Sequence, residues 1–409
     1  MKDTMKIITT IIPVIIAIGL ILTAADRSFA VVDTPTISNV SESTTTISGS
    51  GFGVGGTTNI TWDNFEDGAV NTTATVGTWG SVNALGASSQ SRHSNSHYAA
   101  HHNFTRDATA GVRGINSVLG QKWFIQYWVK LDSFDWGTGL YGSNSQHLSN
   151  IKFLRLWNPG SITENFYTAF DWSLNGNSVS YPENVQGATM NYYDSPFSKS
   201  SLSDNQWHLL QFEFIDSSSP GSADAVFKVW HNGQLVENRT GFVGRTTSDL
   251  KRPFFIGFYS AWGPNTALGE TTREPNDYYM DDVYAAPTLA RVELGNASTY
   301  DACTHREIQV PSAWSDTSIT ITPDKGSFSD SDNAYLFVVN ADGVPSAGYE
   351  LTGGNPGDVN DDGVVNVLDL IRVAKDFGKV SGFNPSSDID GNGRVDVRDL
   401  ILVARNFGR

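Results

Sequence analysis

Cysteine, charged residues and basic residues are all scarce in this chain of 409 residues. Cys303 is the only cysteine, so no disulfide bond can form within the chain. Charged residues make up 17% of the chain, against about 25% in an ordinary soluble domain. The 27 Lys and Arg residues are outnumbered by 43 Asp and Glu residues, for a net charge of −16. Because such a charge repels a phosphate backbone, nucleic-acid binding is excluded as the general function.

Aromatic and small residues take the place of charge, with 11 Trp and 39 Gly in the chain. A chain of this length accommodates two to four domains at roughly 100–200 residues per domain. So many large apolar side chains can offset the entropy of ordering, which excludes disorder for most of the chain. The composition favours an exported, β-rich protein.

The N-terminus has the pattern of a signal peptide over residues 1–30. Lys2 and Lys6 precede an apolar run at residues 7–25, and Ser28-Phe29-Ala30 supplies small residues before a cleavage site. The pattern predicts secretion, with no membrane span after cleavage. An uncleaved anchor at the cell surface is the alternative, because the apolar run is nearly long enough to cross a bilayer.

Two segments near the C-terminus, residues 358–378 and 388–408, repeat with a period of 30. Each opens with oxygen-bearing residues at positions 1, 3, 5, 9 and 12 of a loop, and with Gly363 or Gly393 at position 6. This spacing wraps the chain around one Ca²⁺ ion, and the carbonyl at position 7 completes the ligand set. The predicted ligands of the two ions are Asp358, Asn360, Asp362, Val364, Asn366 and Asp369 in the first loop, and Asp388, Asp390, Asn392, Arg394, Asp396 and Asp399 in the second.

Each loop is followed by apolar residues at helical spacing, and a glycine closes each predicted helix. Residues 353–357 break helices, so no helix enters the first loop. A duplicated loop and exit helix, with Asp at position 12, resembles the dockerin module over residues 351–409. The resemblance implies a cohesin-type partner on a scaffold or cell-surface protein. The residues at positions 10 and 11, Val367-Leu368 and Val397-Arg398, depart from the Ser-Thr-like pair of the family. A calcium-stapled module without a cohesin partner is the alternative.

The middle of the chain, residues 57–288, contains short aromatic strands separated by turns such as Asn232-Gly233. Its first and last strands, near residues 62–68 and 278–284, are expected to pair. The pattern resembles the concanavalin A-like jelly roll of lectins, laminarinase-like hydrolases and some alginate lyases. Fold alone does not determine function.

Polar residues alternate with apolar ones in several of these strands, which predicts a polar and aromatic trough on the outer face of the sandwich. The predicted polysaccharide-binding residues in this trough are Trp128, Lys152, Glu213 and Trp230. An ordinary solvated sheet face is the alternative.

Catalytic residues cannot be assigned from the sequence. The paired acids of laminarinase-like hydrolases and the Arg, Gln-x-His and Tyr motifs of jelly-roll alginate lyases are not recognisable. Four histidines, His93, His97, His101 and His102, lie within ten residues, but their spacing fits a polar strand and loop better than a metal site. Whether the protein is an enzyme is left open. If it is one, a glycoside hydrolase or a polysaccharide lyase is expected.

The segments on either side of the jelly roll, residues 31–56 and 289–350, resemble two halves of an IPT/TIG immunoglobulin-like domain. Extra strands of one larger β domain are the alternative. The predicted fold is therefore mainly β, with a jelly-roll sandwich inserted in a small Ig-like β-sandwich and a small α-helical calcium-binding dockerin-like domain at the C-terminus. The expected function is a secreted modular protein of polysaccharide binding or degradation. A structural cell-surface protein is a further alternative.

Overall fold

The computed structural model describes residues 34–408 except 42–44, 56, 58, 84, 94–95, 105–107, 110, 116–119, 133–149, 159–160, 172–177, 181–182, 185–193, 199–201, 203, 251, 261–275, 330–333, 352–356, 361, 363 and 390–392. The predicted signal peptide lies outside the described residues. None of the helices in the described part combines the length and apolarity needed to cross a bilayer.

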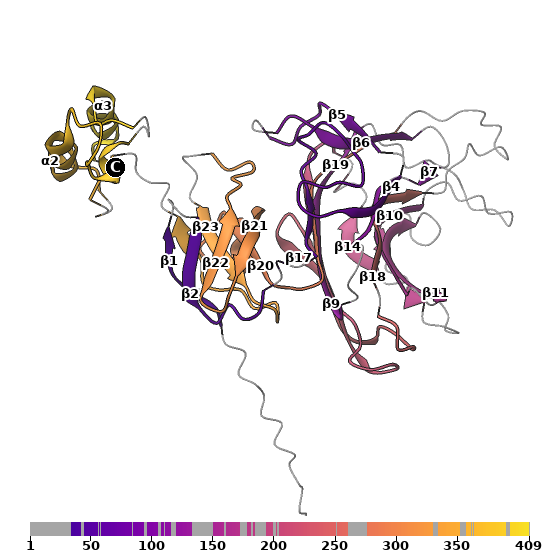
Figure 1. The fold of residues 1–409 in the computed structure, drawn as a ribbon. Coiled ribbons are helices and arrows are strands. Elements are labelled where there is room, and N and C mark those ends of the chain that lie inside the picture. The colour runs from indigo at the N-terminus through magenta and orange to yellow at the C-terminus, as the bar shows by residue number, and fades with distance from the viewer. Residues whose placement is uncertain are drawn as a thin grey trace, which may run out of the picture. The chain divides into compact units, whose positions relative to one another are not determined.

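Strands from two pieces of the chain that are far apart in sequence form one sheet (Figure 1). We call these pieces, with predicted limits 31–56 and 289–350, the split module. Strand β2 pairs antiparallel with β22, which is the pairing that one module made of both pieces requires. The resemblance to an IPT/TIG domain and the exact domain limits stay predictions. Within the described residues, the order is β1-β2-β22-β21-β20-β23-β24. The elements are β1 (Thr36–Ser41), β2 (Thr46–Ser50), β20 (Arg291–Gly295), η3 (Tyr300–Ala302), β21 (Arg306–Trp314), β22 (Ser318–Thr322), β23 (Ala334–Val339) and β24 (Tyr349–Leu351).

The core of the split module is built from both pieces of the chain. Ile47 and Phe52 from the first piece are fully buried against Val292, Ile319 and Leu336 from the second. Since about 25 residues cannot bury a core alone, the first piece depends on the second for its stability.

The jelly-roll module (residues 57–288) is a sandwich of two sheets, as the sequence predicts. One sheet has nine strands among the described residues, with the main order β14-β12-β11-β10-β18-β8-β4. Its strands are β4 (Trp79–Asn83), β7 (Ala108–Thr109), β8 (Gly111–Ile115), β10 (Asn150–Asn158), β11 (Ser161–Asp171), β12 (Ser178–Ser180), β13 (Glu183–Asn184), β14 (Asp194–Ser198) and β18 (Arg252–Ser260).

The other sheet has eight strands in the described part of the chain, with the main order β17-β16-β15-β9-β19-β6-β5. The expected pairing of the first and last strands is present, because β3 pairs antiparallel with β19. The strands are β3 (Thr61–Asp63), β5 (Gly86–Ser88), β6 (Ala99–Phe104), β9 (Lys122–Asp132), β15 (His208–Ile215), β16 (Ala223–His231), β17 (Gln234–Val243) and β19 (Asn276–Ala286). Asn232 and Gly233 both have positive φ in the tight turn between β16 and β17, as two-residue hairpin turns require.

The core of the jelly-roll module lies between its two sheets. Alternate residues of β9 and β15, such as Tyr127 and Phe212, face Leu154 and Ile256 of the nine-stranded sheet. Tyr127 Oη donates a hydrogen bond of 2.8 Å to the Phe153 carbonyl, which ties one sheet to the other. Burial holds the pKa of Tyr127 well above its usual value, so this phenol stays a donor.

The C-terminal segment (predicted limits 351–409), which we call the calcium module after its predicted ligands, contains the two predicted helices, α2 (Val367–Asp376) and α3 (Val397–Asn406), and the short η4 (Pro385–Ser387). Val373 and Val403 are buried in a small shared core with Val359, Val365 and Val395. Gly378 and Gly408 follow the helices with φ of +83° and +84°, the left-handed conformation typical of a residue just past a helix end.

Candidate metal centre and sheet face

The same residues that begin each helix also belong to the predicted metal loops. Asn366 accepts a hydrogen bond from Leu368 N at 2.8 Å, and Asp369 accepts one from Asn366 N at 2.8 Å. Asp396 and Asp399 make the same capping box at the start of α3. Each box satisfies amides that the first helical turn leaves without a partner. The side chains at positions 9 and 12 are thereby held in place by the backbone.

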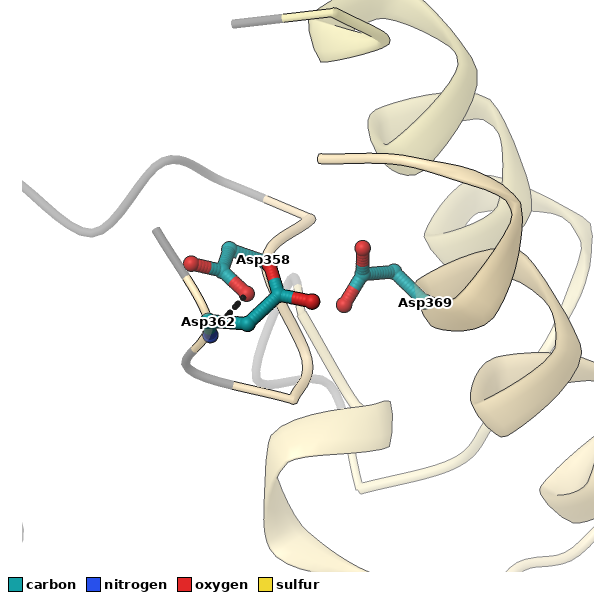
Figure 2. Close-up of side chains that lie close together, drawn as sticks. All are labelled: Asp358, Asp362 and Asp369. Carbon is teal, nitrogen blue, oxygen red and sulfur yellow. Dashed lines mark hydrogen bonds between the residues drawn. The ribbon is translucent and has the colours of Figure 1, made fainter. Parts of the chain in front are cut away.

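Three carboxylates of the first loop converge on one point. The candidate ligand atoms of Asp358, Asp362 and Asp369 all lie within 4.8 Å of one another. Figure 2 shows Asp358 and Asp362 on the loop and Asp369 at the start of the helix, with their carboxylates directed toward a common space. Asp369 is fully buried, whereas Asp362 is exposed. Like charges at this separation repel, and a divalent cation between them relieves the repulsion.

The other predicted ligands of the first loop lie around these carboxylates. Asp362 N donates to Asp358 Oδ1 at 3.1 Å and to Asn360 Oδ1 at 2.8 Å. The side-chain amide of Asn366 donates to the Val364 carbonyl at 3.0 Å. Hard oxygens of carboxylate, amide and carbonyl type are what Ca²⁺ prefers. The donor set therefore fits a calcium ion at this loop.

The second loop is described only in part, because Asp390 and Asn392 lie outside the described residues. Asp399 is fully buried and accepts hydrogen bonds from Ile389 N at 2.7 Å and Asp396 N at 2.8 Å. Asp388 accepts one from Gly393 N at 2.8 Å. Arg394, whose carbonyl is the predicted position-7 ligand, is exposed. The bond from Asp396 N to Asp399 repeats the bond from Asn366 N to Asp369 in the first loop, so the position-12 carboxylate is anchored to position 9 in both loops.

The two repeats are joined by reciprocal backbone hydrogen bonds. Gly408 N, after the second helix, donates to the Val365 carbonyl of the first loop at 2.8 Å. Gly378 N, after the first helix, donates to the Val395 carbonyl of the second loop at 2.8 Å. Each loop is therefore held by the end of the other repeat's helix, and the two sites share one folded unit.

The four residues of the predicted trough lie in two different sheets of the jelly-roll module. Lys152 is in β10 of the nine-stranded sheet, whereas Trp128, Glu213 and Trp230 are in β9, β15 and β16 of the other sheet. The expectation that all four residues share one face is therefore wrong. Alternation of polar and apolar residues identifies the two faces of a strand, but it does not identify the sheet to which the strand belongs.

The expected solvent exposure of the trough is also wrong for the three residues on the eight-stranded sheet. Trp128, Glu213 and Trp230 are 6%, 2% and 8% exposed. Trp128 lies against His305 of the split module, with 5.3 Å between ring centroids. Glu213 accepts a hydrogen bond of 2.8 Å from Lys228 Nζ on the neighbouring strand. Glycan binding by these residues stays a prediction, and it requires the side chains that bury them to move away.

Buried charged groups connect the split module to the face of the eight-stranded sheet that bears Trp128. Burial raises the pKa of Asp282 to about 6, against the charge of Arg92. Burial also acts to raise the pKa of Glu307, but the charge of Arg92 and the hydrogen bond from His305 outweigh it and lower that pKa to about 2. Sequence analysis missed these groups, because Arg92 lies in a loop and no local pattern links it to residues roughly two hundred positions away.

The four clustered histidines are divided between β6, which contains His101 and His102, and the segment before it, which contains His93 and His97. His101 Nε2 lies 2.7 Å from Asp277 Oδ1, and His97 Nδ1 lies 3.1 Å from Glu66 Oε2. The carboxylates of Asp358, Asp362 and Asp369 are the one cluster of metal-ligand type found among the described residues. The positions of the histidines in β6 and in the segment before it agree with the expectation of a polar strand and loop.

Comparison with known proteins identifies the C-terminal segment. Residues 356–408 match the dockerin type I domain family. Dockerin type I domains bind calcium, in agreement with the acidic cluster of the first loop. No curated protein sequence matches the chain significantly.

Solved structures resemble the β part of the chain at low sequence identity. The endo-β-1,4-glucuronan lyase of the fungus Trichoderma reesei is 14% identical, with a TM-score of 0.38 over 54% of this chain and 95% of that one. Alginate lyase Aly36B is 14% identical, with a TM-score of 0.36 over 56% and 96%. The catalytic domain of a glycoside hydrolase family 131 protein from Coprinopsis cinerea is 14% identical, with a TM-score of 0.33 over 56% and 94%. Similarities of this size assign no substrate or activity to this chain.

Proposed function

We propose that this protein is exported and attaches through its calcium module to a cohesin-type partner, while its jelly-roll module binds polysaccharide. The observation that carries the proposal is the dockerin type I match. Each helix begins at a predicted ligand residue whose side chain also caps the helix. Two calcium ions hold the module in its binding-competent fold.

The helices of the calcium module present apolar residues that its own core does not use. Leu368 and Val397 are 54% and 57% exposed, at the loop positions next to the helix starts. Ile371 and Ile401 continue the same exposed faces one turn later. Apolar side chains grouped in this way are typical of a protein-binding surface. The cohesin partner is therefore expected to contribute an apolar patch.

Titration calorimetry of the full chain against a panel of cohesin domains tests the docking proposal. Binding is expected with calcium and is expected to be lost with chelator. Leu368→Asp combined with Val397→Asp is expected to weaken binding by at least about a hundredfold, because a charge would be buried in an apolar contact. Val380→Asp, at an exposed position between the helices, is the matched control. If no cohesin domain binds, or if Val380→Asp weakens binding equally, the docking proposal is wrong and calcium only stabilises the fold of the module.

Polysaccharide binding is proposed for the jelly-roll module on the side of the nine-stranded sheet. Support comes from the backbone register: Lys152 pairs with Tyr259 of β18, and Arg155 pairs with Tyr167 of β11 and Phe255 of β18. Cationic and aromatic residues therefore occupy neighbouring positions of three strands. Aromatic rings suit stacking on sugar rings, and cations suit hydroxyl and carboxylate groups.

A glycan array, a reducing-sugar assay and an assay for unsaturated products distinguish the functions left open by the sequence. Retention of a glycan without products supports a binding module. Release of reducing ends alone supports a hydrolase, whereas an unsaturated product supports a lyase. If no polysaccharide is retained or cleaved, the glycan proposal is wrong and a structural surface protein is the better assignment.

A further inference from the structure

We infer that the split module stays packed on the eight-stranded sheet face and that residues 34–351 behave as one body, which means that they unfold as one cooperative unit. The buried ion pairs of Arg92, which we call the clamp, hold the two modules together. The inference concerns the β part of the chain and does not depend on the cohesin or glycan proposals. Its consequence is that the face bearing Trp128 and Trp230 is an internal contact and not a ligand surface.

Arg92 reaches from a loop of the jelly-roll module to carboxylates of both modules. Its guanidinium donates to Asp282 of β19, with Nε at 2.8 Å, and to both oxygens of Glu307 of β21, at 2.7 and 2.9 Å. The Arg92 side chain is only 2% exposed. Its Cζ lies 4.4 Å from the centroid of the Trp128 ring, whose neighbour is His305. A buried arginine with two carboxylates and an aromatic face is held in one position, because each donor has a specific acceptor.

A second set of buried polar contacts crosses the same boundary at the centre of the sheet. Gln211 Nε2 donates to Glu293 Oε1 of β20 at 2.7 Å, and Gln211 Oε1 accepts from Arg306 Nη2 of β21 at 2.7 Å. Gln126, beside Gln211 on the sheet, accepts from Gln211 Nε2 at 3.0 Å. All four residues are fully buried. The bonds of Gln211 to Glu293 and Arg306 need a partner from each module, so separation would leave buried donors and acceptors unpaired.

Apolar contact adds to the polar contacts. Trp62, Phe124 and Tyr284 of the jelly-roll module form one buried cluster with Ile308 and Val310 of the split module. This cluster is distinct from the cores of the two modules. A boundary with its own apolar cluster and internal ion pairs resembles the interior of a domain more than a transient contact.

Hydrogen exchange of the calcium-loaded full chain tests the clamp. Arg92→Met keeps most of the side-chain volume and removes the charge. It is expected to raise hydrogen exchange in β9 and β21 together by about tenfold, because both strands become exposed when the two modules separate. Arg239→Met is the matched control, because Arg239 stacks on Phe242 within the jelly-roll module at 4.8 Å. The control is expected to leave exchange in β21 unchanged. Unchanged β21 exchange in Arg92→Met would overturn the clamp.

Glu307→Gln provides a second variant that preserves shape if Arg92→Met folds poorly. The effects of Arg92→Met and Glu307→Gln are expected to be strongly non-additive in the double variant, because both remove the same ion pair. Additive effects would overturn the role of Arg92. Calorimetry of the wild type is expected to give one unfolding transition for residues 34–351. Two separate transitions for the β modules would overturn the single-body inference.

Discussion

The calcium module and the eight-stranded sheet face hold their polar residues in opposite ways. In the calcium module, the carboxylates of Asp358, Asp362 and Asp369 come from one short stretch of chain and converge around a single space (Figure 2). At the sheet face, Arg92 and Glu307 come from distant parts of the chain and neutralise each other. Converging like charges call for a cation, whereas paired opposite charges need no ligand. Polar residues close together thus indicate a binding site only when their charges remain uncompensated by the protein.

Removing calcium is the largest perturbation that separates the two regions. Chelator is expected to abolish the helical signal of the calcium module, because two ten-residue helices are too short to persist alone in water. The unfolding transition of the β modules is expected to stay in place. Far-ultraviolet circular dichroism combined with calorimetry measures both. A helical signal that survives chelation would contradict the calcium assignment.

Removing one ligand from each loop sharpens the assignment of two ions. Asp358→Ala and Asp388→Ala are each expected to reduce the calcium stoichiometry from two to one, since each removes the carboxylate at position 1 of its loop. The double variant is expected to bind none and to lose its helices. Asp376→Ala is the control, because this residue bonds Asn384 N at 2.9 Å and Ser387 Oγ at 2.8 Å outside the ligand positions. Loss of an ion in the control would show that stoichiometry follows folding instead of ligation.

A cavity in the jelly-roll core is expected to leave the calcium module unaffected. Phe212 is buried between Tyr127 and Phe227, with ring centroids 6.1 and 6.5 Å away. Phe212→Ala is expected to cost about 3–5 kcal/mol of unfolding free energy, because the burial is lost and a cavity remains. Denaturant unfolding measures the cost, and calcium titration is expected to give an unchanged stoichiometry. A reduced stoichiometry would mean that the two regions fold together.

The pH dependence of stability offers a smaller effect confined to the β part. Burial raises the pKa of Asp63 to about 6, against hydrogen bonds from Trp79 and Phe65. Because the folded state holds this proton more tightly than the unfolded state, stability falls as pH rises from about 4 to about 6 and then levels. A difference of about two pKa units corresponds to about 3 kcal/mol.

Asp63→Asn is expected to flatten that part of the stability profile, since the asparagine does not titrate. Trp79 Nε1 and Phe65 N both donate to Asp63, so the substitution also costs one acceptor at every pH. The change in slope between pH 4 and 6, and not the absolute stability, is therefore the informative quantity. An unchanged slope would assign the effect to Asp282, whose pKa burial raises to about 6 as well.

The parts of the molecule that could be predicted are those decided by neighbouring residues. The short aromatic strands expected within residues 57–288 include β9, β15 and β16, because aromatic and β-branched runs bounded by turns indicate strands directly. Both helices begin where the loop spacing places them, since the position-9 residues Asn366 and Asp396 are also good helix caps. The dockerin resemblance is confirmed by the family match at residues 356–408.

The shared face and the solvent exposure predicted for the trough are wrong, because both depend on residues that are distant in the sequence. Gln126, Trp128 and Lys130 alternate with apolar residues in β9, and the pattern correctly indicates that the strand has two different faces. The same pattern occurs whether the polar face meets water or another module's buried Arg306 and Glu293. The sequence pattern groups Lys152 with Trp128 for the same reason, since strand order in a sandwich depends on long connections that local spacing does not encode.

By itself, the sequence determined the spacing of the two predicted metal loops, their exit helices and the β class of the remaining chain. Each of these depends on residues within one turn, one strand or one loop, where backbone geometry converts spacing directly into position. Only the tertiary structure decided that Arg92 joins Asp282 to Glu307. Contacts of this kind form between segments separated by some two hundred residues or more, and they are selected by the packing of whole sheets. No local pattern specifies which buried charge will lie opposite which.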